Sequence, residues 1–374
     1  MTICGKIPFN SRLVPVEIET EGEVIKSIRE IEDDNFPVIL PGFIDIHTHG
    51  GGGMDVNHIE NMEDVEKLSL FYASHGVTSF QLSLVTDTEE SMTKCLEVLG
   101  DAKERTLGGA QLVGIHLEGP FLSDEYKGSM PSELIVDPDP ELFDRYYAAS
   151  RGHISYITLA PERDGAMEFV SMLRRKGVVV SMGHSSAEYE TAMEAIKNGV
   201  TSATHLFNAM KLFHMHRPAI SGAALESDSV YTEIISDGFH LHPGTVRLVL
   251  KTKGLDRVVA ITDSIMAAGL PDGEYKLGVN DVVVKDGDAK LRNGVRAGST
   301  LTLDKALRNL IKFTGLGPET LWRILSKNQS ELMGLSDRGS LVVGKRADMV
   351  VLSENMDVLK TIVGGKTVYE KEDK

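Results

Sequence analysis

Residues 41–50 read Pro-Gly-Phe-Ile-Asp-Ile-His-Thr-His-Gly, and the rest of the chain is interpreted around this stretch. An apolar strand ends here in His47 and His49 and continues into glycines. Residues i and i+2 of a strand point to the same side, so both imidazoles can reach one metal ion or one pocket. Two histidines at a strand end are also explained as structural hydrogen-bonding groups, so the sequence must supply their partners elsewhere.

Apolar, strand-like segments alternate with helical segments after this stretch. The helical segments, for example 61–75, 87–104, 164–176 and 187–198, carry apolar residues at a spacing of three to four. Eight strands with intervening helices over about 225 residues predict a (β/α)8 TIM-type barrel, although an open doubly wound sheet shares the alternation. The eight candidate strands are 43–49, 78–84, 112–118, 154–160, 178–184, 202–208, 231–237 and 258–263.

The positions of the polar residues separate these two α/β folds. Titratable residues lie at the carboxyl ends of six of the eight strands. Barrel active sites are built at this end of many strands, whereas an open sheet concentrates its chemistry at one switch point. We therefore predict a closed barrel. The residues are His47, His49, Glu118, His184, His205, Asp237 with His240, and Asp263.

The two ends of the chain have a different, β-rich pattern. Residues 13–27 alternate apolar and polar around a Glu-Gly turn, and the chain from about residue 340 consists of short strands separated by Gly and Asn turns. We expect both ends to pair into one small β-sandwich domain, formed by residues 1–40 and 335–374. The barrel domain would then span residues 41–334.

The segment between the eighth strand and the C-terminal β-rich part carries several turn signals. Residues 271–298 combine these signals with short apolar runs and predict a hairpin excursion. Two helices, near 301–313 and 318–333, are expected to follow.

Composition restricts the class of partner. The chain has 374 residues, 41% of them apolar, which is enough for a large core. Its 39 basic and 55 acidic residues give a net charge of −16, which repels nucleic acid and anionic membranes and favours a small-molecule substrate. Cys4 and Cys95 form no disulfide or metal spacing, and no signal peptide or apolar run of about 18 residues is apparent. We expect a cytoplasmic protein with no nucleic-acid or membrane partner.

The polar strand ends form a candidate metal site. Four imidazoles and two carboxylates at a barrel mouth suit zinc, iron(II), manganese or cobalt. Each residue alone has a structural explanation, but their convergence favours metal binding. The six candidate ligands are His47, His49, Glu118, His184, His205 and Asp263.

The order of motifs resembles a known family. The segments PGFIDIHTHGGGG, GIHLEGPF, GHSSA, THLFNAM, DGFH and TDS are followed by AGSTLTLDKA and GKRADMVVL. Together they resemble the amidohydrolase superfamily and, within it, the N-acetylglucosamine-6-phosphate deacetylase family. The resemblance runs from about Pro41 to the end of the chain.

The resemblance implies roles for individual residues. Glu118, His184 and His205 match the principal metal ligands of the family, and His47 with His49 match the pair that holds a second metal when it is present. One or two divalent ions per subunit are therefore expected, with zinc first and iron, manganese or cobalt as alternatives.

Further matches concern catalysis and the substrate. Asp263 matches the catalytic carboxylate, His240 matches a substrate contact, and the backbone around Asn208 and Ala209 matches contacts near the sugar phosphate. A metal that lowers the pKa of water to about 7 would supply the nucleophile. Asp263 would act as general base and then as general acid. The products would be acetate and an amino-sugar phosphate.

One departure from the family lies after HLEGP. Family members usually read Lys-Gly-Ala-His, and the histidine helps to polarise the acetamide carbonyl, whereas residues 127–130 of this chain end in Met130. A thioether cannot donate that hydrogen bond, and loss of such a donor typically costs about 10²–10³ in rate. Either another group compensates, with His214 and His216 as candidates, or the substrate is placed differently.

A second departure lies in the loop 211–218. An arginine of this loop commonly reaches the substrate phosphate, often across a dimer interface, and His216 occupies its ungapped position with Arg217 one residue later. Arginine offers a fixed fork for phosphate and histidine does not. Arg217 either serves this role after a shift of the loop or is a surface residue. We count Met130, His216 and Arg217 among the candidate substrate-binding residues, and we expect a homodimer.

Three functions follow from these features. The first is metal-dependent deacetylation of N-acetylglucosamine 6-phosphate. The second is the same chemistry on N-acetylgalactosamine 6-phosphate, a non-phosphorylated N-acetyl amino sugar or an N-acyl amino acid, as the two departures suggest. The third is a metal-binding protein without activity, against which the presence of Asp263 argues.

Overall fold

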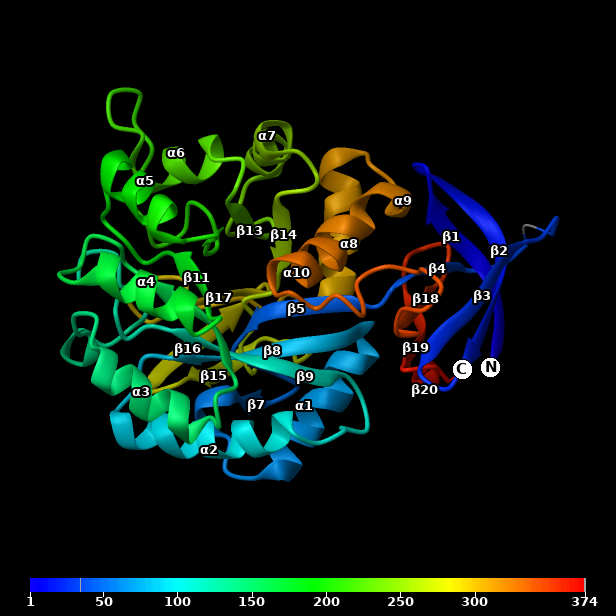
Figure 1. Cartoon of the computed structure of the whole chain (residues 1–374), viewed down its shortest axis with the longest axis horizontal. Helices are drawn as coiled ribbons and strands as arrows, with labels where there is room; N and C mark the ends of the chain where they lie inside the picture. Colours follow the sequence, from blue (N-terminus) through cyan, green and yellow to red (C-terminus); the bar gives the residue numbers. More distant parts are fainter. Residues whose placement is uncertain (34, 373–374) are drawn as a thin grey trace.

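The computed structural model describes residues 1–33 and 35–372 and consists of a barrel with a smaller sheet beside it (Figure 1). Both ends of the chain lie in the smaller part. The smaller part has an apolar core of its own, and residues such as Leu40 and Val350 of its sheet also belong to the core of the barrel. Among the described helices, none has the length and apolar character that crossing a bilayer requires.

Eight parallel strands form the barrel, in the hydrogen-bonded order β14-β13-β12-β11-β10-β9-β8-β5. The backbone N–H of Asp263 donates to the His47 carbonyl (2.9 Å) and that of His49 to the Ser264 carbonyl (2.7 Å), which links the last strand to the first. The predicted barrel is thus confirmed. The strands are β5 (Phe43–Thr48), β8 (Val77–Val85), β9 (Gln111–Glu118), β10 (Ile154–Leu159), β11 (Val179–Met182), β12 (Ser202–Ala203), β13 (Tyr231–Ile235) and β14 (Val258–Ile261).

Helices cover the outside of the barrel. The Asn61 side chain caps the first helix by accepting hydrogen bonds from the backbone N–H groups of Glu63 and Asp64. The apolar residues of this helix face the strands. The helices expected at 61–75, 87–104, 164–176 and 187–198 are all present. The helices are α1 (Met62–Ser74), α2 (Glu89–Lys103), α3 (Pro140–Ala149), α4 (Ala166–Arg175), α5 (Tyr189–Asn198), α6 (Ala219–Glu226), α7 (Pro243–Lys253) and α8 (Leu303–Thr314), with short 3-10 turns at Val56–His58 and Ser132–Leu134.

The prediction of one continuous helix over residues 318–333 is wrong. The chain instead forms α9 (Pro318–Leu321), a 3-10 turn (Trp322–Leu325) and α10 (Lys327–Leu332). Ser326 leaves the helical conformation at the break, and its hydroxyl donates to the Gly42 carbonyl (2.7 Å). The side chain of Gln329 donates to the Ala260 carbonyl in β14 (2.9 Å). Hydrogen bonds to the barrel therefore override the helical pattern.

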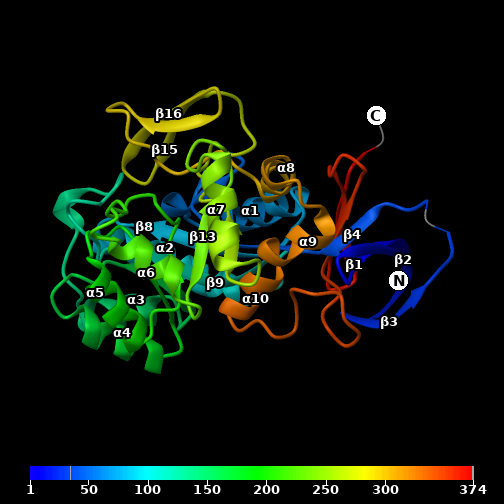
Figure 2. The same cartoon turned by 90° about the horizontal axis from the view of Figure 1, so that it is seen from above.

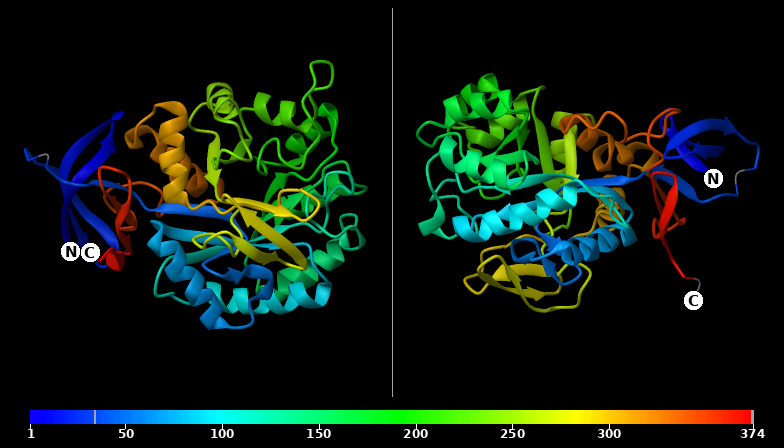
Figure 3. Two further views of the ribbon diagram at one scale, coloured as in Figure 1. Left: turned by 180° about the vertical axis from the view of Figure 1, so that it is seen from behind. Right: turned by 60° about the horizontal axis from the view of Figure 1, so that its bottom comes forward.

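The excursion after β14 has three antiparallel strands rather than the predicted two. They are β15 (Gly273–Leu277), β16 (Asn280–Lys285) and β17 (Asp288–Leu291), joined by tight turns with glycine at positive φ. Their apolar face packs with Met130 and Ile265. Figure 2 and the left view of Figure 3 show this small sheet lying against one side of the barrel.

The terminal segments form one continuous seven-stranded sheet in the order β20-β19-β18-β4-β1-β2-β3. Val16 and Ile25 of its N-terminal part share a core with Met349 and Ile362 of its C-terminal part. The two ends of the chain therefore pair into one domain, as expected, but its strands form a single sheet whose N-terminal and C-terminal halves pack against each other. Its strands are β1 (Thr2–Phe9), β2 (Arg12–Glu21), β3 (Val24–Glu30), β4 (Val38–Pro41), β18 (Met349–Leu352), β19 (Val358–Val363) and β20 (Lys366–Glu370); β6 (Gly50–Gly51) and β7 (Met54–Asp55) form a separate pair after β5.

Candidate metal centre

The six side chains predicted as metal ligands lie together at the carboxyl ends of the barrel strands. All are buried. They form two groups of three, in each of which the candidate ligand atoms lie within 4.8 Å of one another. The groups are His47, His49 and Asp263, and Glu118, His184 and His205.

Three of these residues share an uncommon backbone conformation. His184, His205 and Asp263 each lie two residues beyond the end of a strand and have φ values of 47°, 29° and 49°. Non-glycine residues rarely adopt this left-handed region, which costs on the order of 1–3 kcal/mol. The sharp turn after each of these strands therefore places the polar residue at the barrel mouth, and the surrounding packing must support it.

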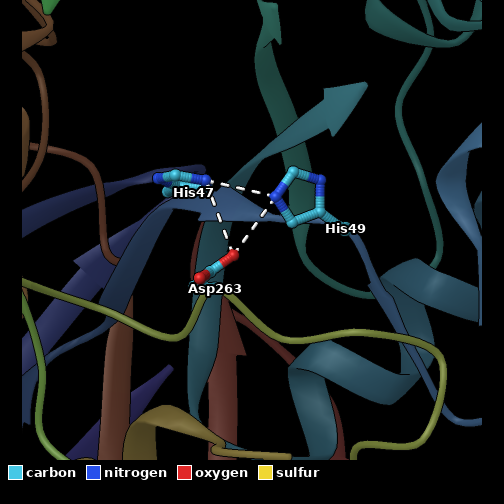
Figure 4. Close-up of side chains that lie close together, drawn as sticks. All are labelled: His47, His49 and Asp263. Atoms are coloured by element: carbon cyan, nitrogen blue, oxygen red, sulfur yellow. Dashed lines mark hydrogen bonds and ion pairs between the residues drawn. The ribbon is translucent and has the colours of Figure 1, made fainter. Parts of the chain in front are cut away.

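The first group is drawn in Figure 4. The Nε2 atoms of His47 and His49 are 3.2 Å apart. The Oδ1 atom of Asp263 lies 3.2 Å from His49 Nε2 and 3.7 Å from His47 Nε2. Three potential ligand atoms thus point toward one small volume.

The second group has the same form. Oε1 of Glu118 lies 3.2 Å from His184 Nε2 and 3.1 Å from His205 Nε2, and the two Nε2 atoms are 3.1 Å apart. Glu118 also contacts the first group, with Oε1 3.3 Å from His47 Nε2 and Oε2 3.3 Å from His49 Nε2. One carboxylate therefore lies between two clusters of imidazoles.

The outer ring nitrogens of three histidines have fixed acceptors. His49 Nδ1 lies 3.0 Å from the Ser83 carbonyl oxygen, and His184 Nδ1 lies 3.0 Å from the Tyr126 carbonyl oxygen. His47 Nδ1 lies 3.0 Å from Oε2 of Glu233. Because these oxygens accept, each Nδ1 carries a proton, so Nε2 is the nitrogen that faces the centre and offers a lone pair there when the ring is neutral.

The buried carboxylates favour positive charge at this centre. Burial opposes a charge on His49, but hydrogen bonds with Asp263 and Glu118 outweigh it and raise its pKa to about 9. Burial likewise opposes a charge on Glu118, yet His184 and His47 hold the pKa of this carboxyl well below its usual range. Protons therefore balance the carboxylates in the metal-free protein.

The donor set fits a divalent cation. Tetrahedral zinc with bonds of about 2.0–2.1 Å to nitrogen has neighbouring ligand atoms roughly 3.3 Å apart. The separations in the second group and two of the three in the first are close to this value, and the distance from His47 Nε2 to Asp263 Oδ1 is longer, at 3.7 Å. Lone pairs of neutral imidazoles at this separation repel one another unless a proton or a cation lies between them. A metal ion would displace the protons and satisfy the same carboxylates.

A pocket of about 290 Å³ opens onto the two groups. Met130, Asn208, Ala209 and His240 all line it, as do residues 294–296 of the excursion. His240 is held by Asp237, whose Oδ2 lies 2.7 Å from its Nδ1. The remaining ring nitrogen of His240 is thus available to a ligand.

His216 and Arg217 do not line this pocket in the single chain. Both are exposed on the loop 211–218, as is His214. Within one chain, His214 and His216 therefore do not replace the hydrogen bond that Met130 lacks. Met130 itself is buried against the excursion.

Two residues of the site do not emerge from the sequence reasoning. Glu233 is fully buried within β13, where its carboxylate accepts hydrogen bonds from His47, the Tyr156 hydroxyl (2.6 Å) and the His205 backbone N–H (3.1 Å). The sequence does carry one signal for Glu233, because it is a lone glutamate within an otherwise apolar strand. Arg296 lines the pocket from the turn-rich excursion, where no strand pattern indicates its direction.

Known proteins are similar to this chain over most of its length. The model of the amidohydrolase family matches residues 38–368. N-acetylglucosamine-6-phosphate deacetylase of Bacillus subtilis (strain 168) is 37% identical over 91% of this chain and 87% of its own length. The crystal structure of the Thermotoga maritima N-acetylglucosamine-6-phosphate deacetylase has a TM-score of 0.92 at 35% identity, covering 99% of this chain and 100% of that chain.

A third similar protein was solved with a ligand. It is a mutant of the Mycobacterium smegmatis N-acetyl-D-glucosamine-6-phosphate deacetylase in complex with N-acetyl-D-glucosamine-6-phosphate. Its TM-score is 0.93 at 31% identity, covering 98% of this chain and 99% of that chain.

Proposed function

Because the chain belongs to the amidohydrolase family and, within it, to the N-acetylglucosamine-6-phosphate deacetylase family, we propose that it hydrolyses the acetamide of N-acetylglucosamine 6-phosphate. The products are acetate and glucosamine 6-phosphate. The observation that carries the proposal is the convergence of four imidazoles and two carboxylates beside a pocket.

The proposed metal site uses both groups of ligands. Glu118, His184 and His205 hold one ion, and His47 with His49 and Asp263 offers a place for a second. Zinc, iron(II), manganese and cobalt all suit this nitrogen and oxygen donor set, with zinc as the first candidate. When bound, such an ion supplies a Lewis acid for the amide carbonyl and lowers the pKa of water at the site.

The proposed acid–base residue is Asp263. Its carboxylate lines the pocket beside the imidazoles, so it can take the proton of the attacking water and return it to the leaving amine. Burial opposes its negative charge, but the hydrogen bond with His49 and the nearby His47 lower the pKa of its carboxyl. Asp263 is therefore ionised, which is the form that a general base requires.

The sugar occupies the remaining pocket in this proposal. His240, held by Asp237, and the backbone at Asn208 and Ala209 contact the substrate. Met130 offers an apolar surface and no donor, so the chain provides no side-chain hydrogen bond to the carbonyl from this position. Arg217 would contribute only from the partner subunit of a homodimer.

Acetate release from N-acetylglucosamine 6-phosphate tests the proposed function. We expect activity that a chelator abolishes and that added zinc, manganese or cobalt restores. Metal analysis of the purified protein gives the identity and number of the ions. The panel includes N-acetylgalactosamine 6-phosphate, N-acetylglucosamine and an N-acyl amino acid. Absence of chelator-sensitive turnover of N-acetylglucosamine 6-phosphate would reject the proposal, and turnover of N-acetylgalactosamine 6-phosphate alone would favour the alternative substrate.

A further inference from the structure

Arg296 gives the candidate active-site pocket a permanent positive charge. Among the described residues that line the pocket, it is the single lysine or arginine side chain. The whole chain carries a net charge of −16, Asp288 contacts Arg296, and the charge of Asp237 also acts on it. An isolated cation in this setting must be held by specific contacts.

Asp288 holds the guanidinium in a fixed orientation. Nε of Arg296 donates to Oδ1 (2.8 Å) and a terminal nitrogen donates to Oδ2 (3.0 Å), so the contact is a bidentate fork. Two of the five N–H groups are used, and three remain for a ligand. The Nζ atom of Lys290 lies 2.7 Å from Oδ2 of the same Asp288 carboxylate. The cluster of Arg296, Lys290 and Asp288 therefore keeps a net positive charge.

The backbone that follows Arg296 is hydrogen-bonded to the backbone of the proposed catalytic residue, Asp263. The backbone N–H of Ser299 donates to the Asp263 carbonyl (2.7 Å), and that of Ile265 donates to the Ser299 carbonyl (3.0 Å). A Cβ on Gly298 would lie only 2.9 Å from the Asp263 carbonyl oxygen, so this approach requires glycine. The segment that carries Arg296 is therefore positioned relative to the reaction centre. The Arg296 side chain is 38% exposed and lines the pocket, which leaves it accessible to a bound substrate.

We propose that Arg296 is a specificity-determining residue that binds the phosphate of the substrate from within the same chain. The inference rests on the proposed function, because it takes the substrate to be an amino-sugar phosphate. A guanidinium donates charge-assisted, paired hydrogen bonds to phosphate oxygens, whereas an uncharged sugar gains little from it. His216 and Arg217 lie outside the pocket of this chain and do not supply that charge.

Kinetics of the metal-loaded, full-length enzyme on N-acetylglucosamine 6-phosphate and N-acetylglucosamine test this role. The variants are Arg296→Gln, Arg296→Lys and the control Arg292→Gln, which removes an exposed arginine of the same excursion that pairs with Glu274. Loss of a charged hydrogen-bond partner corresponds to about a 10- to 100-fold change. We expect R296Q to raise KM for the phosphorylated sugar by this factor, with a smaller change in kcat and no change on the unphosphorylated sugar. R296K should recover part of the loss.

Calorimetric binding of glucosamine 6-phosphate and glucosamine gives a readout independent of turnover. We expect the wild type and R292Q to prefer the phosphorylated amine and R296Q to lose that preference. An active enzyme whose R296Q variant matches the wild type would overturn the inference while the proposed function stands. An equal loss on both sugars would also overturn it, because it indicates a structural role. An inactive wild type rejects the proposed function, and the binding preference alone then decides the role of Arg296.

Discussion

Glu233 determines how His47 presents its second nitrogen to the centre. Its buried carboxylate is saturated by the His47 ring, the Tyr156 hydroxyl and the backbone of His205. A carboxylate behind a metal-binding histidine fixes the tautomer and the ring orientation and raises the basicity of the ligand. We therefore regard Glu233 as a positioning residue for the site of His47 and His49.

Replacing Glu233 by Gln tests this arrangement. The amide keeps the shape but removes the charge behind His47, and loss of such a partner typically lowers metal affinity by about 10- to 100-fold. We expect weaker binding of the ion at His47 and His49, whereas the ion at Glu118, His184 and His205 should stay bound. Competition with a chelator measures both affinities. Tyr156→Phe is the matched control, because it removes a hydrogen bond to Glu233 without touching His47. Equal metal affinity in Glu233→Gln and the wild type would contradict the role.

Asp263→Asn separates acid–base catalysis from metal binding. An amide cannot accept the proton of the attacking water, so we expect kcat to fall by about 10²–10⁴. The group of Glu118, His184 and His205 is intact in this variant, and metal analysis should still find an ion there. Turnover within a factor of two of the wild type would exclude Asp263 as the base.

At the scale of single residues, a functional residue could be predicted from the sequence when it directly follows an apolar strand. His184, His205 and Asp263 each follow an apolar strand, so their convergence can be anticipated from barrel topology. Glu233 lies inside a strand, where sequence does not distinguish the barrel interior from the helix-facing side. Arg296 lies beyond two turns of the excursion, whose direction depends on packing against Met130 and Ile265.

At the scale of elements, Asp304 joins α8 to α1. Its carboxylate contacts His75 Nδ1 (3.0 Å) at the end of α1 and accepts a hydrogen bond from Arg308 (2.8 Å) one turn later in α8. Burial alone would raise the pKa of Asp304, but the hydrogen bond and charge of His75, with help from Thr302 and Arg308, hold it below the usual range. The folded state therefore favours the ionised carboxyl.

This contact makes part of the stability dependent on pH. Because the folded-state pKa of Asp304 is depressed, its contribution is complete above the unfolded value of about 4 and is lost as the pH falls through the folded-state value. We expect Asp304→Asn to lower the free energy of unfolding at pH 7 by about 1–3 kcal/mol. The difference from the wild type should shrink as the pH falls below about 4. Denaturant unfolding at a series of pH values checks this, and a constant difference would contradict it.

The loop 211–218 is the element that a homodimer would use. Leu212, Phe213 and Met215 expose 75%, 53% and 78% of their surface, which is unusual for three neighbouring apolar side chains. We expect light scattering to give a wild-type mass of twice the 40.8 kDa chain and the double variant Leu212→Ser, Met215→Ser to be monomeric. Leu248→Ser on α7, which replaces another exposed leucine, is the control. A dimer that survives the double substitution would place the interface elsewhere.

Element types were more predictable than their exact extent. The barrel strands and their helices follow simple apolar periodicities, which local sequence reveals. The break at Ser326 depends on a hydrogen bond to Gly42, 284 residues earlier in the chain. The non-local contact at Ser326 leaves little trace in a single sequence. The third strand of the excursion, by contrast, pairs with β16 across the tight Asp286-Gly287 turn, which is a local hairpin signal that the prediction of a simple hairpin missed.

At the scale of the whole molecule, the small sheet is continuous with the strand that carries the histidine pair. Residue 42 alone separates β4 of the small sheet from β5 of the barrel. β4 pairs with β18 from the C-terminal part, with Leu40 opposite Val350 and Pro41 opposite Met349. We propose the division into residues 1–40 with 335–374 and residues 41–334 for these two domains. The C-terminal strands therefore support the start of β5.

Removing the C-terminal strands tests whether the barrel depends on them. A chain ending at Arg346 lacks Met349, Val350 and Leu352, which are fully buried, and it exposes the edge of β4. Burial of each such side chain stabilises by about 1.5–3 kcal/mol, so their loss alone rivals the roughly 5–15 kcal/mol that holds a typical protein folded. We expect this chain to be insoluble or to unfold below 37 °C, whereas a control ending at Lys371 should match the full chain in thermal unfolding and metal content. A soluble truncated chain with full metal content would show instead that the barrel and its metal centre fold without the C-terminal strands.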